Sequence, residues 1–178
     1  MSSTPVREAL QRLSGRRMIA GGPEKGFRMA TPTEDTLIGL YKVSAMLLHY
    51  AVKNRQPCTM KDSVGELPRI NLRSSEDAAI CESVATMIAE LFIGIACLSR
   101  NEEVVHIIDN INERLRMFRI IECERIPNSV QESKKLSELY RKKLYTDLIR
   151  MLRKYHAKRL GLSEPIFNET LRRMYAPS

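Results

Sequence analysis

The sequence has no tryptophan, only 6% aromatic residues and three histidines among its 178 residues. It has four cysteines, and none of them forms a Cys-x-x-Cys pair, so neither a zinc knuckle nor a redox motif is indicated. We expect Cys81 and Cys97, which lie in apolar helical surroundings, to be small reduced core residues. A chain of this length can bury a hydrophobic core without disulfides.

Long apolar runs are also missing. The longest candidate, Met87–Leu98, is interrupted by Glu90 and is shorter than the roughly 18–20 residues that a membrane span needs. The first residues lack the apolar stretch of a secretory signal. We therefore expect a cytoplasmic protein that has no contact with the membrane.

Motifs of catalysis are lacking as well. The sequence shows no Ser/His/Asp arrangement, no His-Glu-x-x-His motif, no carboxylate pair in an evident site and no Gly-rich phosphate loop after a strand. These absences predict that the protein is not an enzyme.

Basic residues, by contrast, are abundant at both ends of the chain. The formal net charge is +8 and the pI is about 9.5. Residues 1–30 carry six Arg or Lys against two Glu, and residues 132–178 carry twelve against five acidic residues, so the middle is mildly acidic. Basic ends suit contact with a polyanion, although a basic helical face is often only solvated.

The first 30 residues predict a helix followed by a β-hairpin. Thr4 can cap the helix and Pro5 fits its first position. An apolar stripe runs along it and Gly15 ends it; the stripe consists of Val6, Ala9, Leu10 and Leu13. Two short apolar runs, at residues 18–20 and 27–29, then flank a glycine-rich turn.

The remainder predicts an antiparallel bundle of five to seven helices, so the fold class is all-α. We expect helices over about 32–54, 74–98, from 102 past 118, one continuous helix carrying the stripe 136–155, and 163–174, with a short helix near 60–66. The third helix has the clearest apolar period; its residues are Val104, Ile108, Ile111, Leu115 and Phe118. We divide the chain into residues 1–31 and 32–178.

The opening resembles part of a GntR-type winged helix. The family pattern Ser-Arg-Thr-Pro-Val-Arg-Glu-Ala-Leu is matched by residues 2–10 except at Ser3, and its later apolar and wing positions are matched by Leu13, Met18-Ile19 and Lys25–Met29. The resemblance implies a recognition helix followed by a hairpin wing. The two helices that usually precede them have no counterpart, so either the sequence starts late or the protein is naturally truncated.

The rest is similar to the FCD domain, the helical effector and dimerisation domain of FadR-like regulators. The matching positions are Thr33-Glu34-Asp35, Leu40-Tyr41, Ser99-Arg100-Asn101, Arg114-Leu115-Arg116 and Tyr155-His156. The resemblance implies a bacterial, homodimeric transcriptional regulator whose helical domain senses a small organic effector and whose front part binds operator DNA. The alternative is a truncated, DNA-independent module that only dimerises or binds a ligand.

The resemblance also assigns residues to DNA contact. The positions implied are Ser3, Thr4, Arg7, Lys25 and Gly26. A helix N-terminus, hydroxyl groups and an arginine suit an anionic duplex. Because Ser3 stands where the family commonly has a guanine-reading arginine, we expect the sequence specificity to differ or weaken.

Many FCD domains hold a divalent metal with an Asp and three His residues. The aligned positions here are Ile88, Phe92 and approximately Lys134, so His156 is the only ligand that remains. We therefore predict no metal and no cofactor. We assign Ile88, Phe92 and His156 to ligand binding and expect a more apolar cavity, which either takes a more hydrophobic effector or is a filled core. We expect His49 and His106 to occupy ordinary helix faces.

Overall fold

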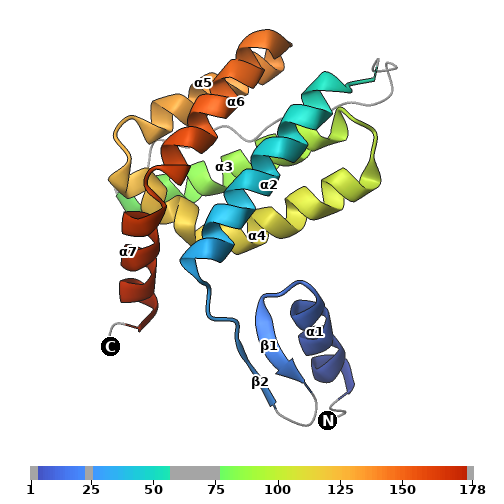
Figure 1. Ribbon diagram of the computed structural model, residues 1–178, viewed down its shortest axis with the longest axis vertical. Coiled ribbons are helices and arrows are strands. Elements are labelled where there is room, and N and C mark those ends of the chain that lie inside the picture. The colour runs from blue at the N-terminus through green and yellow to red at the C-terminus, as the bar shows by residue number, and fades with distance from the viewer. Residues whose placement is uncertain (1–3, 23–25, 57–76, 176–178) are drawn as a thin grey trace. The chain divides into compact units, whose positions relative to one another are not determined.

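The computed structural model describes residues 4–22, 26–56 and 77–175 (Figure 1). In these ranges the chain forms seven α-helices and one two-stranded antiparallel sheet, which confirms the all-α class with a preceding hairpin. The chain divides into two compact units, Met1–Thr33 and Glu34–Ser178, so the division falls two residues beyond the expected one. The short helix expected near residues 60–66 and Cys58 lie outside the described residues.

The first unit consists of helix α1 (Thr4–Gly15) and strands β1 (Ile19–Gly22) and β2 (Gly26–Met29). Gly21 has a φ of 106°, and a Cβ atom at this position would lie 2.0 Å from the carbonyl oxygen of Gly26. Only glycine fits such a close approach of two backbones at a left-handed φ. The glycine-rich turn is therefore a requirement of the hairpin.

Helix α1 ends at Gly15, as predicted, but another residue makes the turn. Arg17 has a φ of 58°, its N–H bonds to the carbonyl of Ser14, and the N–H of Met18 bonds to the carbonyl of Leu13 at 3.0 Å. This pair of hydrogen bonds is the Schellman ending of a helix. Gly15 correctly indicated where the helix ends, but the residue with the left-handed φ is Arg17.

The described part of the second unit, residues 34–56 and 77–175, is a bundle of six helices. They are α2 (Glu34–Lys53), α3 (Asp77–Cys97), α4 (Glu102–Arg125), α5 (Ser129–Arg141), α6 (Tyr145–Leu160) and α7 (Ser163–Tyr175). Helix α3 packs most extensively against α4, and α2 packs against α3, α4, α6 and α7 (Figure 1). Helix α5 contacts α3, α4 and α6. Four helices, α3 to α6, thus surround the region in which the candidate site lies.

Helix α3 is the most apolar helix of the bundle. Its segment Ala78–Cys97 is long and apolar enough to cross a membrane, unlike the shorter run expected from the sequence, and 56% of it is buried inside the protein. Central helices of bundles have this composition because neighbours cover several of their faces. The packing against α2, α4 and α5 accounts for the apolar surface of α3.

Helix α4 begins with a clear side-chain cap. Asn101 Oδ1 accepts hydrogen bonds from the N–H groups of Glu103 at 3.0 Å and Val104 at 3.4 Å. The apolar stripe predicted for this helix is confirmed, because all five of its members are at most 5% exposed. The cap and the stripe together place one face of α4 against the core.

The prediction of one continuous helix over residues 136–155 is wrong, because α5 and α6 occupy this range. The range is interrupted by Lys143, which has a φ of 56° and whose N–H bonds to the carbonyl of Tyr140, while the N–H of Leu144 bonds to the carbonyl of Leu139. These bonds form a second Schellman ending. Leu144 is 45% exposed and does not belong to the buried stripe. The sequence does not indicate this break, because a lysine occupies the left-handed position that usually holds glycine.

The expectation for the cysteines is half right. Cys81 is buried, but Cys97 is exposed. Cys97 is the last residue of α3 and lies on the face away from the core, since its neighbours Ile95, Ala96 and Ser99 are buried.

Candidate functional site

The residues predicted to contact DNA belong to the first unit. Ser3 and Lys25 lie outside the described residues. Thr4 is the first residue of α1, Arg7 lies in the first turns of that helix and is exposed, and Gly26 begins β2 with a φ of 71°. A helix start, an exposed guanidinium and a tight hairpin can offer N–H groups to phosphates. DNA contact by these residues stays a prediction.

The three predicted ligand residues meet in the second unit. Phe92 of α3 and His156 of α6 stack with ring centroids 5.7 Å apart. Tyr155 closes the cluster edge-on, at 5.5 Å from Phe92 and 5.2 Å from His156. Ile88, one turn before Phe92, is buried and shares the wall of a cavity with Tyr155. The structure therefore brings Ile88, Phe92 and His156 into one region of the core.

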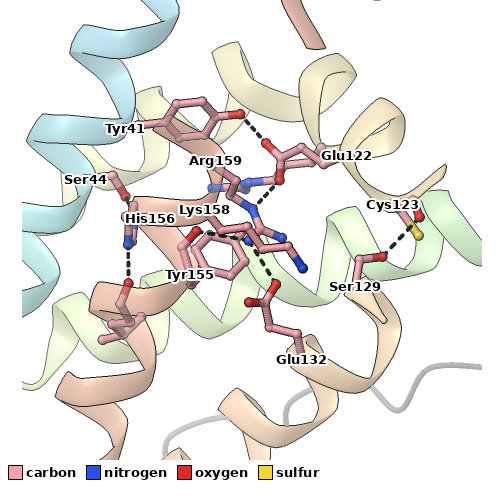
Figure 2. A network of polar contacts seen from close by, with 12 residues as sticks. Tyr41, Ser44, Glu122, Cys123, Ser129, Glu132, Tyr155, His156, Lys158 and Arg159 are labelled. Carbon is pink, nitrogen blue, oxygen red and sulfur yellow. Dashed lines mark hydrogen bonds and ion pairs between the residues drawn. The ribbon is translucent and has the colours of Figure 1, made fainter. Parts of the chain in front are cut away.

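His156 has both ring nitrogens engaged. Nδ1 lies 2.8 Å from the carbonyl oxygen of Leu152, and Nε2 lies 3.2 Å from Oγ of Ser44 (Figure 2). A carbonyl only accepts, so Nδ1 donates and Nε2 accepts the hydroxyl proton of Ser44. Burial, with smaller contributions from Arg159 and Arg119, lowers the pKa of His156 to about 4. The ring is therefore neutral at pH 7.

A divalent metal does not fit the aligned positions. Ile88 and Phe92 have no donor atoms, Lys134 is exposed, and the one remaining imidazole already has a partner at each nitrogen. Across the described ranges, no group of three or more His, Cys, Asp or Glu side chains could hold an ion. A stable site needs several converging donors.

A buried ionic network joins α2, α4, α5 and α6 beside this cluster (Figure 2). Arg159 donates from Nε to Glu122 and from Nη1 to Glu132, the second bond being 2.9 Å long. Tyr41 donates its hydroxyl to the other oxygen of Glu122. The guanidinium carbon of Arg159 lies 3.2 Å from the centre of the Tyr155 ring. One guanidinium is thus matched by two carboxylates.

The network changes the ionisation of its members. Burial, followed by the charge and hydrogen bond of Glu122, raises the pKa of Tyr41. Burial also raises the pKa of Tyr155 to about 12. Burial by itself lowers the pKa of Arg159, but Tyr155 and the two carboxylates more than offset it and the pKa rises. Both tyrosines therefore stay neutral and Arg159 stays charged near neutral pH.

A second guanidinium, that of Arg119 on α4, has neutral partners. It is 3% exposed, and its Nη2 donates to Oδ1 of Asn112 at 2.7 Å. Asn112 in turn donates to the carbonyl of Ala89 at 2.9 Å. The guanidinium carbon lies 5.1 Å from the centre of the Phe92 ring. Nη1 has no hydrogen-bond partner, and no ion pair found among the described residues includes Arg119.

A small cavity lies between α3, α4, α5 and α6. Ile88, Arg119, Ser133 and Arg159 are in its wall, and Oγ of the buried Ser133 also lacks a hydrogen-bond partner. The cavity has about 190 Å³ of empty space including the solvent at its mouth, and its enclosed part is about the size of one water molecule. Charged side chains from α4 and α6 are in its wall beside apolar ones from α3, and the expectation of a more apolar cavity stays a prediction.

Sequence reasoning missed Glu122 and Arg159, although a signal for both exists. Glu122 lies four residues after Phe118, at the next position of the apolar stripe of α4, and Arg159 lies four residues after Tyr155 on α6. Charged residues that continue an apolar stripe are candidates for buried pairs, since an unpaired buried charge is costly. Arg119, four residues after Leu115 of the stripe, gives the same signal, and the uncharged Ser133 gives none.

Comparisons with known proteins agree with the resemblance stated from the sequence. No family model matches the chain. A curated relative from Aminobacter aminovorans, the Nta operon transcriptional regulator, is 30% identical over 125 residues, which is 70% of this chain and 60% of the relative. The matching part of the chain thus spans three fifths of that protein.

Two solved structures share the fold. A protein of Rhodococcus sp. RHA1, assigned as a transcriptional regulator GntR, superposes with a TM-score of 0.68 at 16% identity, covering 93% of this chain and 81% of the other. Lar, described as controlling expression of the Listeria monocytogenes agr system, gives a TM-score of 0.55 at 11% identity over the same shares. These two likenesses show a shared fold, and together with the sequence similarity to a transcriptional regulator they support the resemblance to GntR-type regulators. Assignment to the FadR-like subfamily with an FCD domain stays a prediction.

Proposed function

We propose that this protein is a DNA-binding transcriptional regulator of the GntR type. Its first unit contacts operator DNA, and its helical unit, of the FCD kind, binds a small organic effector and forms a homodimer in the bacterial cytoplasm. The protein has no catalytic role in this proposal. Effector binding changes the spacing of two DNA-reading heads, and so the affinity for the operator.

The observation that carries the proposal is the first unit itself. A proline-initiated helix with the exposed Arg7 is followed by a hairpin whose tight turn requires Gly21. Together with the similarity to a transcriptional regulator, this arrangement supports a recognition helix and a wing.

DNA binding by the full chain tests the proposal. Selection from random duplexes, followed by fluorescence anisotropy, should yield an enriched sequence whose affinity falls steeply with salt, because phosphate contacts release counterions. Arg7→Ala should weaken binding and reduce the salt slope by about one. Arg116→Ala, on an exposed position of α4, is the matched control and should leave binding unchanged.

The rival function is a DNA-independent module that only dimerises or binds a ligand. Failure to enrich any sequence, together with a dimer in sedimentation velocity, would favour the rival. A monomer at micromolar concentration would contradict the dimeric part of the proposal, whichever way the DNA experiment comes out.

A further inference from the structure

We propose that helices α5 and α6 bind the phosphate backbone of duplex DNA, whatever its sequence, through a basic surface. The basic surface is the set of nine lysines and arginines between residues 134 and 158, all of which are exposed. The proposal goes beyond the proposed function, which assigns DNA contact to the first unit. It gives a role to the basic C-terminal part of the chain.

The positive charge of the helical unit is concentrated in this pair of helices. Residues 129–160 carry ten Lys or Arg against three Asp or Glu, whereas helices α2, α3, α4 and α7 together carry an excess of acidic residues. Such segregation creates a local positive potential that attracts polyanions. The nine like charges also repel one another, and an anionic partner relieves that repulsion.

Most cations of the basic surface are not neutralised by the protein itself. Glu138 pairs with Lys135 and Lys142, and Asp147 pairs with Arg150. No ion pair found within residues 4–22, 26–56 and 77–175 includes any of the other six. Surfaces that are only solvated commonly intersperse charges of both signs. A single-sign field of this size therefore indicates a surface that attracts an anionic partner.

Helix α6 arranges part of the basic surface in a row. Arg150, Lys154 and Lys158 follow at intervals of four residues, and Arg153 lies beside them in the sequence. Members of such a row lie on one face of the helix, roughly 6 Å apart along its axis. The opposite face of α6 is buried in the bundle, so the row faces solvent. A line of exposed cations suits the closely spaced charges of a duplex backbone.

A histidine on the neighbouring helix α2 lies within the positive field of the row. The pKa of His49 is lowered, first by burial and then by the charges of Arg153 and Lys53. Protonation of His49 would place a third positive charge close to two others. The field of α6 therefore reaches α2, where Lys53 is also exposed.

The composition of the basic surface favours DNA over an acidic protein. Protein–protein interfaces are depleted in lysine and enriched in aromatic residues, whereas protein–DNA interfaces are strongly positive. Six of the nine cations are lysines, and Tyr140 and Tyr155 are buried. The surface therefore has the charge that a phosphate backbone requires and lacks an aromatic centre for a protein partner.

The same composition favours a duplex over a single strand or a membrane. Proteins hold single strands by stacking bases on exposed aromatic rings, and helices that lie on membranes insert an apolar face. The apolar faces of α5 and α6 pack in the core. Within residues 129–160, Leu144 is the only large apolar side chain that is exposed. One such residue offers neither a stacking platform nor an apolar face.

The experiment measures binding of the full chain to a fluorescent duplex of random sequence. Fluorescence anisotropy is recorded between about 50 and 200 mM salt. The double variant Arg153→Gln/Lys154→Gln should lower the slope of log K against log salt by about two, and should weaken binding about tenfold or more at 0.1 M salt. Glutamine is a good helix former, so far-UV circular dichroism should be unchanged. Should the double variant fail to fold, Lys154→Gln alone should lower the slope by about one.

A matched control removes two charges elsewhere on the helical unit. Arg116→Gln/Arg172→Gln changes exposed positions on α4 and α7, and Glu169 keeps Arg125 and Arg173 as partners. This variant should bind the random duplex with an unchanged slope. Poly-glutamate and vesicles containing phosphatidylserine are added as competitors at equal charge, and both should displace the duplex poorly.

Four results would overturn the proposal. An unchanged slope in Arg153→Gln/Lys154→Gln would show that α6 makes no phosphate contact, and an equal loss in the control would show an effect of net charge alone. Full displacement by poly-glutamate would indicate an acidic protein as the partner. Vesicle binding that the Arg153→Gln/Lys154→Gln variant loses would indicate a membrane surface.

The proposed function is decided by different observations. Enrichment of an operator and its loss in Arg7→Ala report on the first unit. An enriched operator with an unchanged slope in the α6 variant would keep the regulator and refute the basic surface. A reduced slope in the α6 variant without any enriched sequence would refute the regulator and keep the basic surface.

Discussion

The carboxylate of Glu122 on α4 accepts a hydrogen bond from Nε of Arg159 on α6, and both side chains are 2% exposed. The two residues lie 37 positions apart in the chain. Arg159 also binds Glu132 of α5, and Glu122 accepts the hydroxyl of Tyr41 of α2, so the network links four helices. The pair is specific because each oxygen of Glu122 has its own donor.

Breaking this pair should strongly destabilise the helical unit. Arg159→Met leaves two carboxylates without their cation and should lower the free energy of unfolding by about 3–5 kcal/mol in urea denaturation. The matched control is Arg150→Met on the same helix, whose arginine pairs with Asp147 in solvent and should cost less than about 1 kcal/mol. Equal losses for the two variants would show that the buried network contributes no special stability.

His156 should make stability depend on pH. Its pKa is about 4 in the folded protein and near 6.5 when unfolded, so the unfolded chain binds the extra proton between these values. The stabilising contribution of His156 to the free energy of unfolding is complete above pH 6.5. It is lost as the pH falls toward 4, by an amount on the order of 2–3 kcal/mol.

Urea denaturation at several pH values measures this dependence. His156→Gln should flatten the pH profile in that window, and His106→Gln, at an exposed position of α4, should not. A profile that is unchanged in His156→Gln would contradict the assignment of a buried neutral ring.

Replacing the left-handed residue between α5 and α6 by glycine should stabilise the protein. Lys143 has a φ of 56°, and L-residues pay roughly 1 kcal/mol for that conformation. Lys143→Gly should therefore raise the free energy of unfolding by about 0.5–1 kcal/mol. Lys154→Gly, inside α6 and exposed, should instead lower it by about 1 kcal/mol, and both are measured by thermal and urea unfolding.

The hairpin should not tolerate a side chain at Gly21. A Cβ atom there would overlap the carbonyl oxygen of Gly26, and φ is 106°. Gly21→Ala should destabilise the first unit by about 2 kcal/mol or more. The chemical-shift dispersion of the NMR signals of that unit should decrease. A Cβ atom at Gly15 meets nothing within 4 Å, so Gly15→Ala should leave the hairpin spectrum unchanged.

Metal analysis tests the degenerate ligand set. Purified protein should contain well under one zinc, nickel or manganese ion per chain, and a chelator should not alter Tm, because Ile88 and Phe92 have no donor atoms and both nitrogens of His156 are hydrogen-bonded. One ion bound per chain would require ligands other than those at Ile88, Phe92 and His156.

The sequence by itself determined the elements that local rules control. The period of α4, the end of α1 at Gly15 and the glycine-rich hairpin follow from apolar spacing and glycine geometry. The grouping of Ile88, Phe92 and His156 came from the resemblance. All these features depend on residues near one another in the chain or on a shared pattern.

Only the tertiary structure decided what fills the space between the helices. The break at Lys143, the pairing of Glu122 with Arg159 and the unpartnered Nη1 of Arg119 are outcomes of packing among α3, α4, α5 and α6. A lysine adopts a left-handed φ, and a charge becomes buried, when contacts with distant segments offset the local cost. Those contacts have no period and no fixed spacing in the sequence.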